Sequence, residues 1–278
     1  MRGSDQMQMS GPNDSPAAPG GRGGANGRVT LVGGGPGPVE LLTLAAVRAL
    51  GCADVVLFDR LAPNDGLAEL APRAELIDVG KRPGHHLLGQ ESIEALMVRR
   101  ALDGAHVVRL KGGDPFVLGR GGEEVAACRA ARVPVQVIPG ISSAIAVPAG
   151  AGIPVTHRDV SRMFTVVSGH APLSESELQH LAGLDGTIVV LMGVSNLPSI
   201  TAGLARHGLG RDTPVAVIER GLAPEQRTIV STLSEAMWAA SAAGVASPAV
   251  IVIGEVVRLA AEGVAEARST LDAAVVLG

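Results

Sequence analysis

The chain has 278 residues, enough for one large α/β unit or for two modest domains packed together. Hydrophobic residues make up 46% of it and charged residues 18%, which excludes a disordered polymer. Three Phe, one Trp and no Tyr, with a net charge of -4, argue against proteins that stack bases on aromatic rings or bind phosphate backbones through clustered cations.

The first part of the chain predicts a tail followed by a regular α/β domain. Residues 1–27 are rich in Gly, Pro, Ser and Asn with little to bury, so we expect a disordered tail. From residue 28, short β-branched runs alternate with longer Ala- and Leu-rich segments. Strands are expected at 29–32, 55–58, 76–79, 106–110 and 135–138, and helices at 40–50, 90–103 and 119–131. This alternation predicts a mostly parallel sheet covered on both faces, within an N-terminal α/β domain at 28–155.

A second α/β domain is expected at 156–265, with a C-terminal tail at 266–278. Glycines and prolines at 148–154 interrupt the alternation of strand and helix patterns. Further strands are expected at 164–167, 187–191, 214–219, 227–231 and 249–253, and helices near 174–182 and 197–207. Two consecutive strands around a turn at 221–226 predict a mixed sheet with an antiparallel pair.

The two cysteines, Cys52 and Cys128, lie far apart, and neither belongs to a CxxC pair. Their spacing excludes a disulfide framework and a cysteine-based zinc site, and it favours a reducing, cytoplasmic location. The longest apolar runs, such as 187–194, are well short of the roughly 20 residues that cross a bilayer, and the N-terminus lacks the apolar core of a signal peptide. We therefore expect neither a membrane nor a nucleic acid among the partners.

A Gly/Pro turn at 33–38 follows the first expected strand, and Asp59 ends the second. This is the context of a dinucleotide-binding turn, where an acid follows the glycines by about 20 residues. Pro36 and Pro38, however, each remove a backbone N–H that a phosphate would need. On this motif alone, a dinucleotide site and a plain turn without a ligand both stay open.

Glycines and polar residues also follow the other four strands of the first domain, at 59–60, 80–86, 111–115 and 139–143. Because the carboxyl ends of parallel strands meet at one edge of a sheet, we expect one shared ligand site there rather than five separate turns. Gly112 and Gly113 would let a ligand approach the backbone, and Asp114 can accept hydrogen bonds from hydroxyl or ammonium groups. The structural alternative is that Asp114 only initiates a turn.

Other reactive side chains have simpler explanations. The adjacent His85 and His86 point in different directions, and no acid or Cys completes a ligand set at standard spacing, so no metal is expected. One of Ser142 and Ser143 would cap an Ala-rich helix. The acidic pair at 123–124 would complement the dipole of another helix.

Taken together, the loops resemble those of the uroporphyrinogen-III C-methyltransferases, within the S-adenosylmethionine-dependent tetrapyrrole methylase family. The resemblance runs from about residue 29 to residue 259, with the motifs in the same order and at the same spacing. The matching segments are 32–37, 79–82, 109–117, 119–124, 139–141, 152–158, 192–194 and 217–221.

The resemblance implies a homodimer of two α/β domains in the tetrapyrrole methylase architecture, with S-adenosylmethionine between the domains and S-adenosylhomocysteine as product. The implied reaction adds methyl groups to carbons 2 and 7 of uroporphyrinogen III, giving precorrin-2 for siroheme or cobalamin biosynthesis. Asp59 and Lys81 match the proton acceptor and donor, and Arg120, Glu123 and Arg158 match residues implicated in substrate binding or turnover. The cofactor-binding residues implied are Pro36, Gly112, Gly113, Asp114, Val117, Ser142, Ser143, Met192 and Gly221.

The chain departs from the family pattern in the loops themselves. Pro38 and Val39 replace the usual Asp-Pro of the first loop, so any role of that acid is absent here. Leu118 stands where an aromatic residue is common, and Ser142 replaces a frequent Thr. These changes bear on the geometry of the cofactor site, whereas the catalytic candidates remain.

Three alternative functions stay open beside this one. A related methylase of the same fold could act on another precorrin intermediate or on ribosomal RNA, although the low aromatic content and negative charge count against RNA. A nicotinamide-dependent oxidoreductase is disfavoured by Pro36 and Pro38. A non-catalytic tetrapyrrole-binding protein is disfavoured by Asp59 and Lys81.

Overall fold

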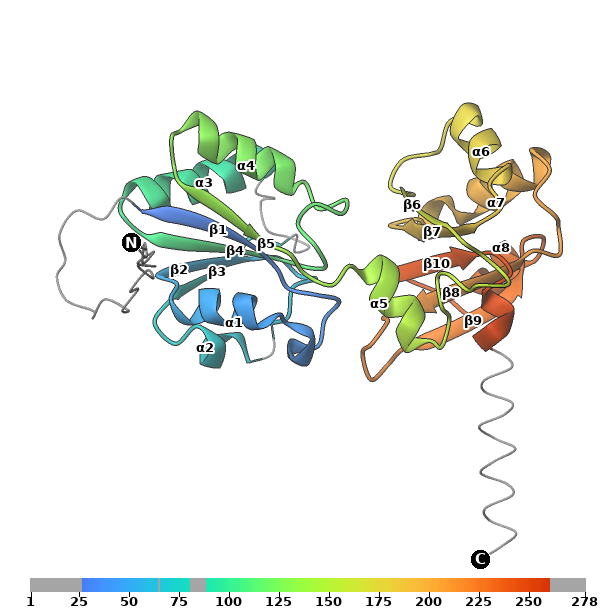
Figure 1. Ribbon diagram of the computed structural model, residues 1–278, viewed down its shortest axis with the longest axis horizontal. Coiled ribbons are helices and arrows are strands. Elements are labelled where there is room, and N and C mark those ends of the chain that lie inside the picture. Colours follow the sequence, from blue (N-terminus) through green and yellow to red (C-terminus); the bar gives the residue numbers. More distant parts are fainter. Residues whose placement is uncertain (1–26, 65, 81–88, 261–278) are drawn as a thin grey trace, which may run out of the picture.

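The computed structural model describes residues 27–64, 66–80 and 89–260. The tails expected at 1–27 and 266–278 lie outside these ranges, apart from Gly27. Two five-stranded sheets follow one another along the chain, each covered by helices (Figure 1). None of the helices in these ranges is long and apolar enough to cross a membrane.

The first sheet is parallel throughout. Its strands are β1 Arg28–Gly33, β2 Val55–Phe58, β3 Glu75–Asp78, β4 His106–Lys111 and β5 Val135–Ile138. Their order is β3-β2-β4-β1-β5, and each neighbouring pair runs in the same direction. All five carboxyl ends therefore meet at one edge, as the alternation of strands and helices predicts.

Helices cover both faces of this sheet, because the central strand β4 is buried on both sides. Helices α1 Leu44–Gly51 and α2 Leu67–Leu70 lie on one face, and α3 Gln90–Leu102 and α4 Gly121–Ala130 lie on the other (Figure 1). Val107 packs in the core beneath α3 and α4, whereas Val108 and Leu110 pack beneath α1. By the period-two alternation of a strand, Arg109 and Lys111 share the face of Val107.

The helix expected at 40–50 is divided in the structure, which corrects that prediction. A 3-10 turn, Val39–Leu41, precedes α1, and Leu42 and Thr43 separate the two. The Thr43 hydroxyl accepts the Ala46 N–H at 3.1 Å and so caps α1, which a threonine in a continuous helix could not do. Helix α4 likewise begins at Gly121 rather than at 119, because Arg120 has a φ of 58°. Helices α2 and α8 were not expected.

The second sheet is mixed. Its strands are β6 Phe164–Ser168, β7 Thr187–Leu191, β8 Pro214–Glu219, β9 Arg227–Thr232 and β10 Ala249–Ile253. The order is β6-β7-β10-β8-β9, with β6 and β7 parallel and the other pairs antiparallel. Helices α6 Glu175–Ala182, α7 Leu197–Arg206 (after a 3-10 turn, Val194–Asn196) and α8 Ala236–Ala242 share a core with one face. One parallel and one mixed sheet confirm the expected fold class.

Helix α5, Ser143–Gly150, connects the two sheets in the chain and packs against the second (Figure 1). Ala144, Val147 and Ile153 share a core with apolar residues of β7, β8 and β10. The range expected for the first domain, 28–155, therefore includes a helix whose apolar side chains are buried by the second sheet. We propose that the boundary between the domains lies near residue 140, ahead of α5.

Two leucines of α1 give a matched test of how this helix packs against the first sheet. Leu50 is fully buried, whereas the Leu44 side chain is 75% exposed. Leu50→Ala leaves a cavity beneath the sheet, so we expect it to lower the free energy of unfolding by about 2–5 kcal/mol. Leu44→Ala should change it by about 0.5 kcal/mol or less. Urea denaturation followed by circular dichroism measures both, and equal losses would contradict the orientation of α1.

Candidate active site

Three loops at the carboxyl edge of the first sheet touch through their backbones. The Gly34 N–H donates to the Lys111 carbonyl at 2.7 Å, and Gly35 and Gly113 exchange two hydrogen bonds of 3.1 and 2.6 Å. A Cβ atom at Gly140 would lie 2.3 Å from the Gly113 carbonyl oxygen, a distance that requires glycine there. The loops after β1, β4 and β5 therefore form one structure, which confirms their expected convergence.

Asp114 fastens two of these loops together. Its Oδ1 accepts the Phe116 N–H at 2.8 Å, and its Oδ2 accepts the Gly140 N–H at 3.0 Å. The first bond is the turn-initiating contact that the sequence left open as an alternative, and the second crosses to the loop after β5. Both carboxylate oxygens thus have backbone partners within the protein.

Helix α5 begins beside this junction. The Ser142 hydroxyl accepts the Ala144 N–H at 3.2 Å, which confirms a helix-capping serine. Ser143 is the first residue of α5, and its backbone nitrogen would lie 3.8 Å from a Cβ atom at Gly113. Gly113 has a φ of 69°, a left-handed conformation that favours glycine, and the space beside it is open.

The second sheet brings two more loops to α5. Gly221 follows β8, and a Cβ atom there would lie 2.3 Å from Cγ1 of Val147 on α5. Met192 follows β7 in a left-handed conformation, with φ at 59° and its side chain 47% exposed. The preceding Leu191 packs in the same core as Val147. Helix α5 is thus the element that relates the loops of the first sheet to those of the second.

The remaining expected cofactor residues border these loops. Pro36 lies between Gly35, which contacts the β4 loop, and Gly37, beside which a Cβ atom would meet no other atom within 4 Å. Val117 belongs to a short exposed apolar segment, in which Phe116 is 61% exposed. The loop after β1 thus carries an open glycine, and the loop after β4 carries an exposed apolar segment.

Asp59 lies immediately beyond the end of β2. Its Oδ1 accepts the N–H groups of Leu61 and Ala62 at 3.2 and 3.1 Å, and its Oδ2 accepts from the Arg109 guanidinium at 3.3 Å. The side chain keeps 29% of its surface exposed. Lys81, the partner expected for it, lies outside the described residues, as do His85 and His86.

A buried cluster of charged side chains lies beneath Asp59. Glu124 of α4 is fully buried, and its Oε1 accepts from Nε of Arg109 at 3.0 Å and from Nζ of Lys111 at 3.1 Å. Gln90 of α3 donates to the same oxygen at 3.4 Å. Burial lowers the pKa of Lys111, and the Arg109 charge lowers it further, while the carboxylate of Glu124 acts in the opposite direction.

Arg120 and Glu123 pair on the surface at the start of α4. The guanidinium bonds both carboxylate oxygens, through Nε to Oε1 at 2.9 Å and through a terminal nitrogen to Oε2 at 2.7 Å. The hydrogen bonds from Arg120 lower the pKa of Glu123. Both side chains are exposed, so the ion pair can separate and Arg120 or Glu123 can bind a charged ligand.

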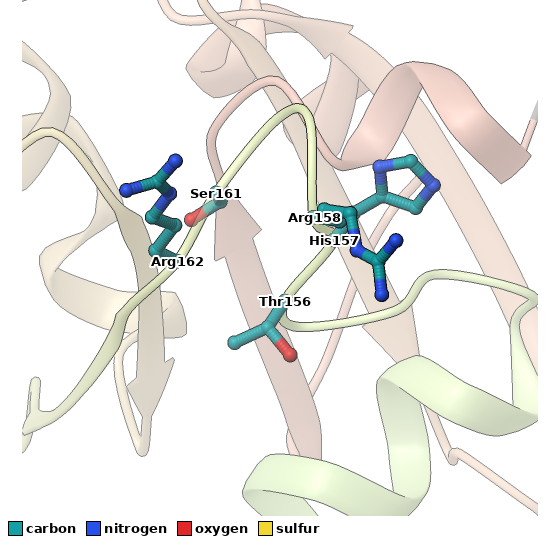
Figure 2. Close-up of a pocket in the computed structure, with 5 residues that line it drawn as sticks. All are labelled: Thr156, His157, Arg158, Ser161 and Arg162. Atoms are coloured by element: carbon teal, nitrogen blue, oxygen red, sulfur yellow. The ribbon is translucent and has the colours of Figure 1, made fainter.

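Arg158 lines a cavity of about 370 Å³ in the segment that leads into β6. Figure 2 shows Arg158 and Arg162 on opposite sides of Ser161, with His157 beside Arg158. The turn is closed by the His157 N–H, which donates to the Ser161 carbonyl at 2.8 Å. Two guanidinium groups and an imidazole make this cavity suited to anions, because its five lining residues include no acid.

No three His, Cys, Asp or Glu side chains come together as a metal site within the ranges that the structure describes. Cys128 lies on the buried face of α4, and burial raises the pKa of its thiol to about 11. Such a thiol is not a nucleophile near neutral pH.

Comparison with known proteins agrees with this arrangement of loops. The model of the Tetrapyrrole (Corrin/Porphyrin) Methylases matches residues 28–237. The chain belongs to this family. The S-adenosyl-L-methionine-dependent uroporphyrinogen III methyltransferase of Methanosarcina barkeri is 47% identical over 240 residues, which cover 85% of this chain and 94% of that protein.

Two further relatives of this tetrapyrrole methylase differ in length. The siroheme synthase of Gluconacetobacter diazotrophicus is 45% identical, and the match covers 84% of this chain but 50% of that protein. A crystal structure of uroporphyrin-III C-methyl transferase from Thermus thermophilus complexed with S-adenyl homocysteine aligns with a TM-score of 0.71 and 43% identity. That alignment covers 84% of this chain and all of the other.

The sequence pointed to the loops of this methylase but missed the cluster beneath them. The sequence predicts for Glu124 only a complement to a helix dipole, and for Arg109 no role beyond its place in the family motif. A signal was present, since Arg109 and Lys111 alternate with apolar residues in a strand that is otherwise fully apolar after its first residue. Two cations on one face of a central strand require a buried acid.

Proposed function

We propose that this tetrapyrrole methylase transfers methyl groups from S-adenosylmethionine to carbons 2 and 7 of uroporphyrinogen III, giving precorrin-2 for siroheme or cobalamin biosynthesis. The observation that carries the proposal is the 47% identity to the M. barkeri enzyme over 94% of that protein's length. The Thermus structure, which holds S-adenyl homocysteine in a similar fold, supports the choice of cofactor.

The residues at the loop junction fit S-adenosylmethionine. A Cβ atom at Gly113 would meet only the backbone nitrogen of Ser143, the first residue of α5, at 3.8 Å, so there is open space beside Gly113 that a larger side chain at residue 113 would fill. Apolar Val117 and Met192 offer surface to the rest of the molecule. We assign the cofactor to the residues Pro36, Gly112, Gly113, Asp114, Val117, Ser142, Ser143, Met192 and Gly221.

The basic groups of the site fit a polycarboxylate substrate. Arg158 lines a cavity with a second guanidinium, and Arg120 is exposed at the start of α4 with Glu123 as its present partner. Carboxylates of the tetrapyrrole would compete with Glu123 for Arg120 through the same bidentate geometry. We therefore assign substrate binding to Arg120, Glu123 and Arg158, in a chain whose overall charge is negative.

The chemistry requires positioning and the removal of a proton. S-adenosylmethionine supplies a methyl group on a positively charged sulfur. A carbon–carbon bond forms to a pyrrole carbon as the carbon–sulfur bond breaks, and a proton must then leave the methylated macrocycle. We propose Asp59 as the acceptor, because it is the partly exposed acid at the end of β2, and Lys81 as the donor.

The assembly and location of the enzyme are also proposals. We propose a homodimer, which the family resemblance implies. We propose a cytoplasmic location, because the exposed Cys52 and the buried Cys128 are both free thiols and suit a reducing compartment.

Incubation with enzymatically prepared uroporphyrinogen III and S-adenosylmethionine, without oxygen, tests the function. We expect mass spectrometry to find a product that carries two added methyl groups. A single addition, or none, would direct the search to another precorrin intermediate. Calorimetric titration with S-adenosylhomocysteine and NAD separates the remaining alternative, since NAD binding alone would indicate an oxidoreductase.

Asp59→Asn tests the proton acceptor. The amide oxygen can still accept the N–H groups of Leu61 and Ala62, so the turn is kept while the base is lost. We expect kcat to fall about 100-fold or more, with the Kd for S-adenosylhomocysteine within about twofold of the original. Asp54→Asn is the matched control, because Asp54 accepts the His106 N–H at the opposite end of β2. An unchanged rate in Asp59→Asn would remove Asp59 from this role.

Gly113→Leu tests the cofactor site. Its control is Gly244→Leu, because both glycines have a positive φ, of 69° and 61°, and a Cβ atom at either position would have no other atom within 3.4 Å. Both variants therefore bear similar backbone strain. We expect only Gly113→Leu to abolish binding of S-adenosylhomocysteine by calorimetry, and equal affinities would place the cofactor elsewhere.

A further inference from the structure

Arg109 connects the proposed proton acceptor to the interior of the first domain. Its side chain is 4% exposed and donates to four acceptors. Nε bonds Oε1 of Glu124 at 3.0 Å, and one terminal nitrogen bonds the main-chain carbonyls of Leu57 and Leu110 at 3.3 and 2.9 Å. The other terminal nitrogen bonds Oδ2 of Asp59 at 3.3 Å. The guanidinium is therefore fixed on the inner side and offers its outer side to Asp59.

The four charged side chains of the cluster balance one another. Arg109 and Lys111 are the cations, and Glu124 and Asp59 are the anions. The side chains of Arg109, Lys111 and Glu124 are 4, 6 and 0% exposed, whereas that of Asp59 is 29% exposed. Asp59 is thus the one member of the four that reaches the surface where a substrate can bind.

We propose that Arg109 is a positioning residue for the methyl transfer, holding Oδ2 of Asp59 while the N–H groups of the following turn hold Oδ1. The inference rests on the proposed role of Asp59 as proton acceptor. A carboxylate held at both oxygens cannot rotate away from the proton that it receives, and small errors of placement are costly in catalysis. Arg109 does not itself touch the substrate in this arrangement.

The geometry distinguishes Arg109 from its neighbour Lys111. Lys111 lies two residues along the same strand and bonds the same oxygen of Glu124 at 3.1 Å, but no hydrogen bond of 3.5 Å or less joins it to Asp59 among the described residues. Burial and the Arg109 charge lower the pKa of Lys111. Lys111 is therefore the matched control, because replacing it disturbs the same buried cluster without removing a bond to Asp59.

Arg109→Lys is the test variant. A lysine keeps the positive charge beside Glu124 but cannot serve acceptors in the fixed fork of a guanidinium, so it cannot hold Glu124, two carbonyls and Asp59 together. We expect kcat to fall about tenfold or more, with the KM for uroporphyrinogen III and the Kd for S-adenosylhomocysteine within about twofold. The melting temperature of each variant is recorded by circular dichroism.

A double-mutant cycle separates positioning from a merely structural role. The cycle compares Arg109→Lys, Asp59→Asn and the double variant, and it is repeated with Lys111→Gln in place of Arg109→Lys. If Arg109 acts through Asp59, the double variant with Arg109→Lys is no slower than Asp59→Asn alone. Any fall in kcat caused by Lys111→Gln should instead be independent of Asp59, so that the double variant shows the product of the two single falls.

The outcomes identify which idea fails. If Asp59→Asn keeps the full rate, the proposed acceptor role fails and this inference fails with it. If Asp59→Asn is slow and Arg109→Lys slows it again by the same factor, only the positioning role fails. Should Arg109→Lys not fold, Arg109→Gln removes the guanidinium that holds Asp59 while Lys111 stays paired with Glu124, and it enters the same cycle.

Discussion

The first domain depends on the neutralisation of two cations inside its sheet. Arg109 and Lys111 lie on one face of β4, the central strand, where an unpaired charge is strongly destabilising. Glu124 meets both from α4, and Asp59 meets Arg109 from the end of β2. Replacing Glu124 alone would take from the buried Lys111 the carboxylate that it pairs with, which is more costly than replacing the whole set. The charge balance therefore fixes how α4 and the β2 loop sit on β4.

A second constraint acts on the other side of the same edge, through the main chain. Gly34, Gly35, Gly113 and Gly140 let three loops approach within hydrogen-bonding distance, and Asp114 fastens two of them. The junction is therefore built mainly of backbone groups, with the Asp114 carboxylate as the side chain that joins them. The cluster of charges and the junction of glycines together place the proposed acceptor and the proposed cofactor site on one edge of one sheet.

Particular residues show which features of the structure can be predicted from the sequence. The strands are predicted nearly residue by residue, because β-branched runs bounded by glycine and proline favour extended backbone. A capping serine at 142 or 143 is predicted from an equally local pattern, and the structure shows that it is Ser142. Thr43 caps the start of α1 inside the range 40–50 where one continuous helix is expected, since a hydroxyl that can cap is indistinguishable from one in a helix interior until the backbone is seen. Asp114 was expected to meet a ligand, yet one of its oxygens bonds Gly140, 26 residues away.

The sequence alone determined the class of fold, the edge at which the loops gather and the family resemblance, because strand periodicity, turn chemistry and motif spacing are local properties of the chain. Only the tertiary structure decided that α5 is buried by the second sheet, that Glu124 neutralises Arg109 and Lys111, and that Arg109 contacts Asp59. The ion pairs of this cluster join residues 13 to 50 positions apart. The energies of these ion pairs depend on burial and on the distance between the charges. Both are set only when the first domain has folded.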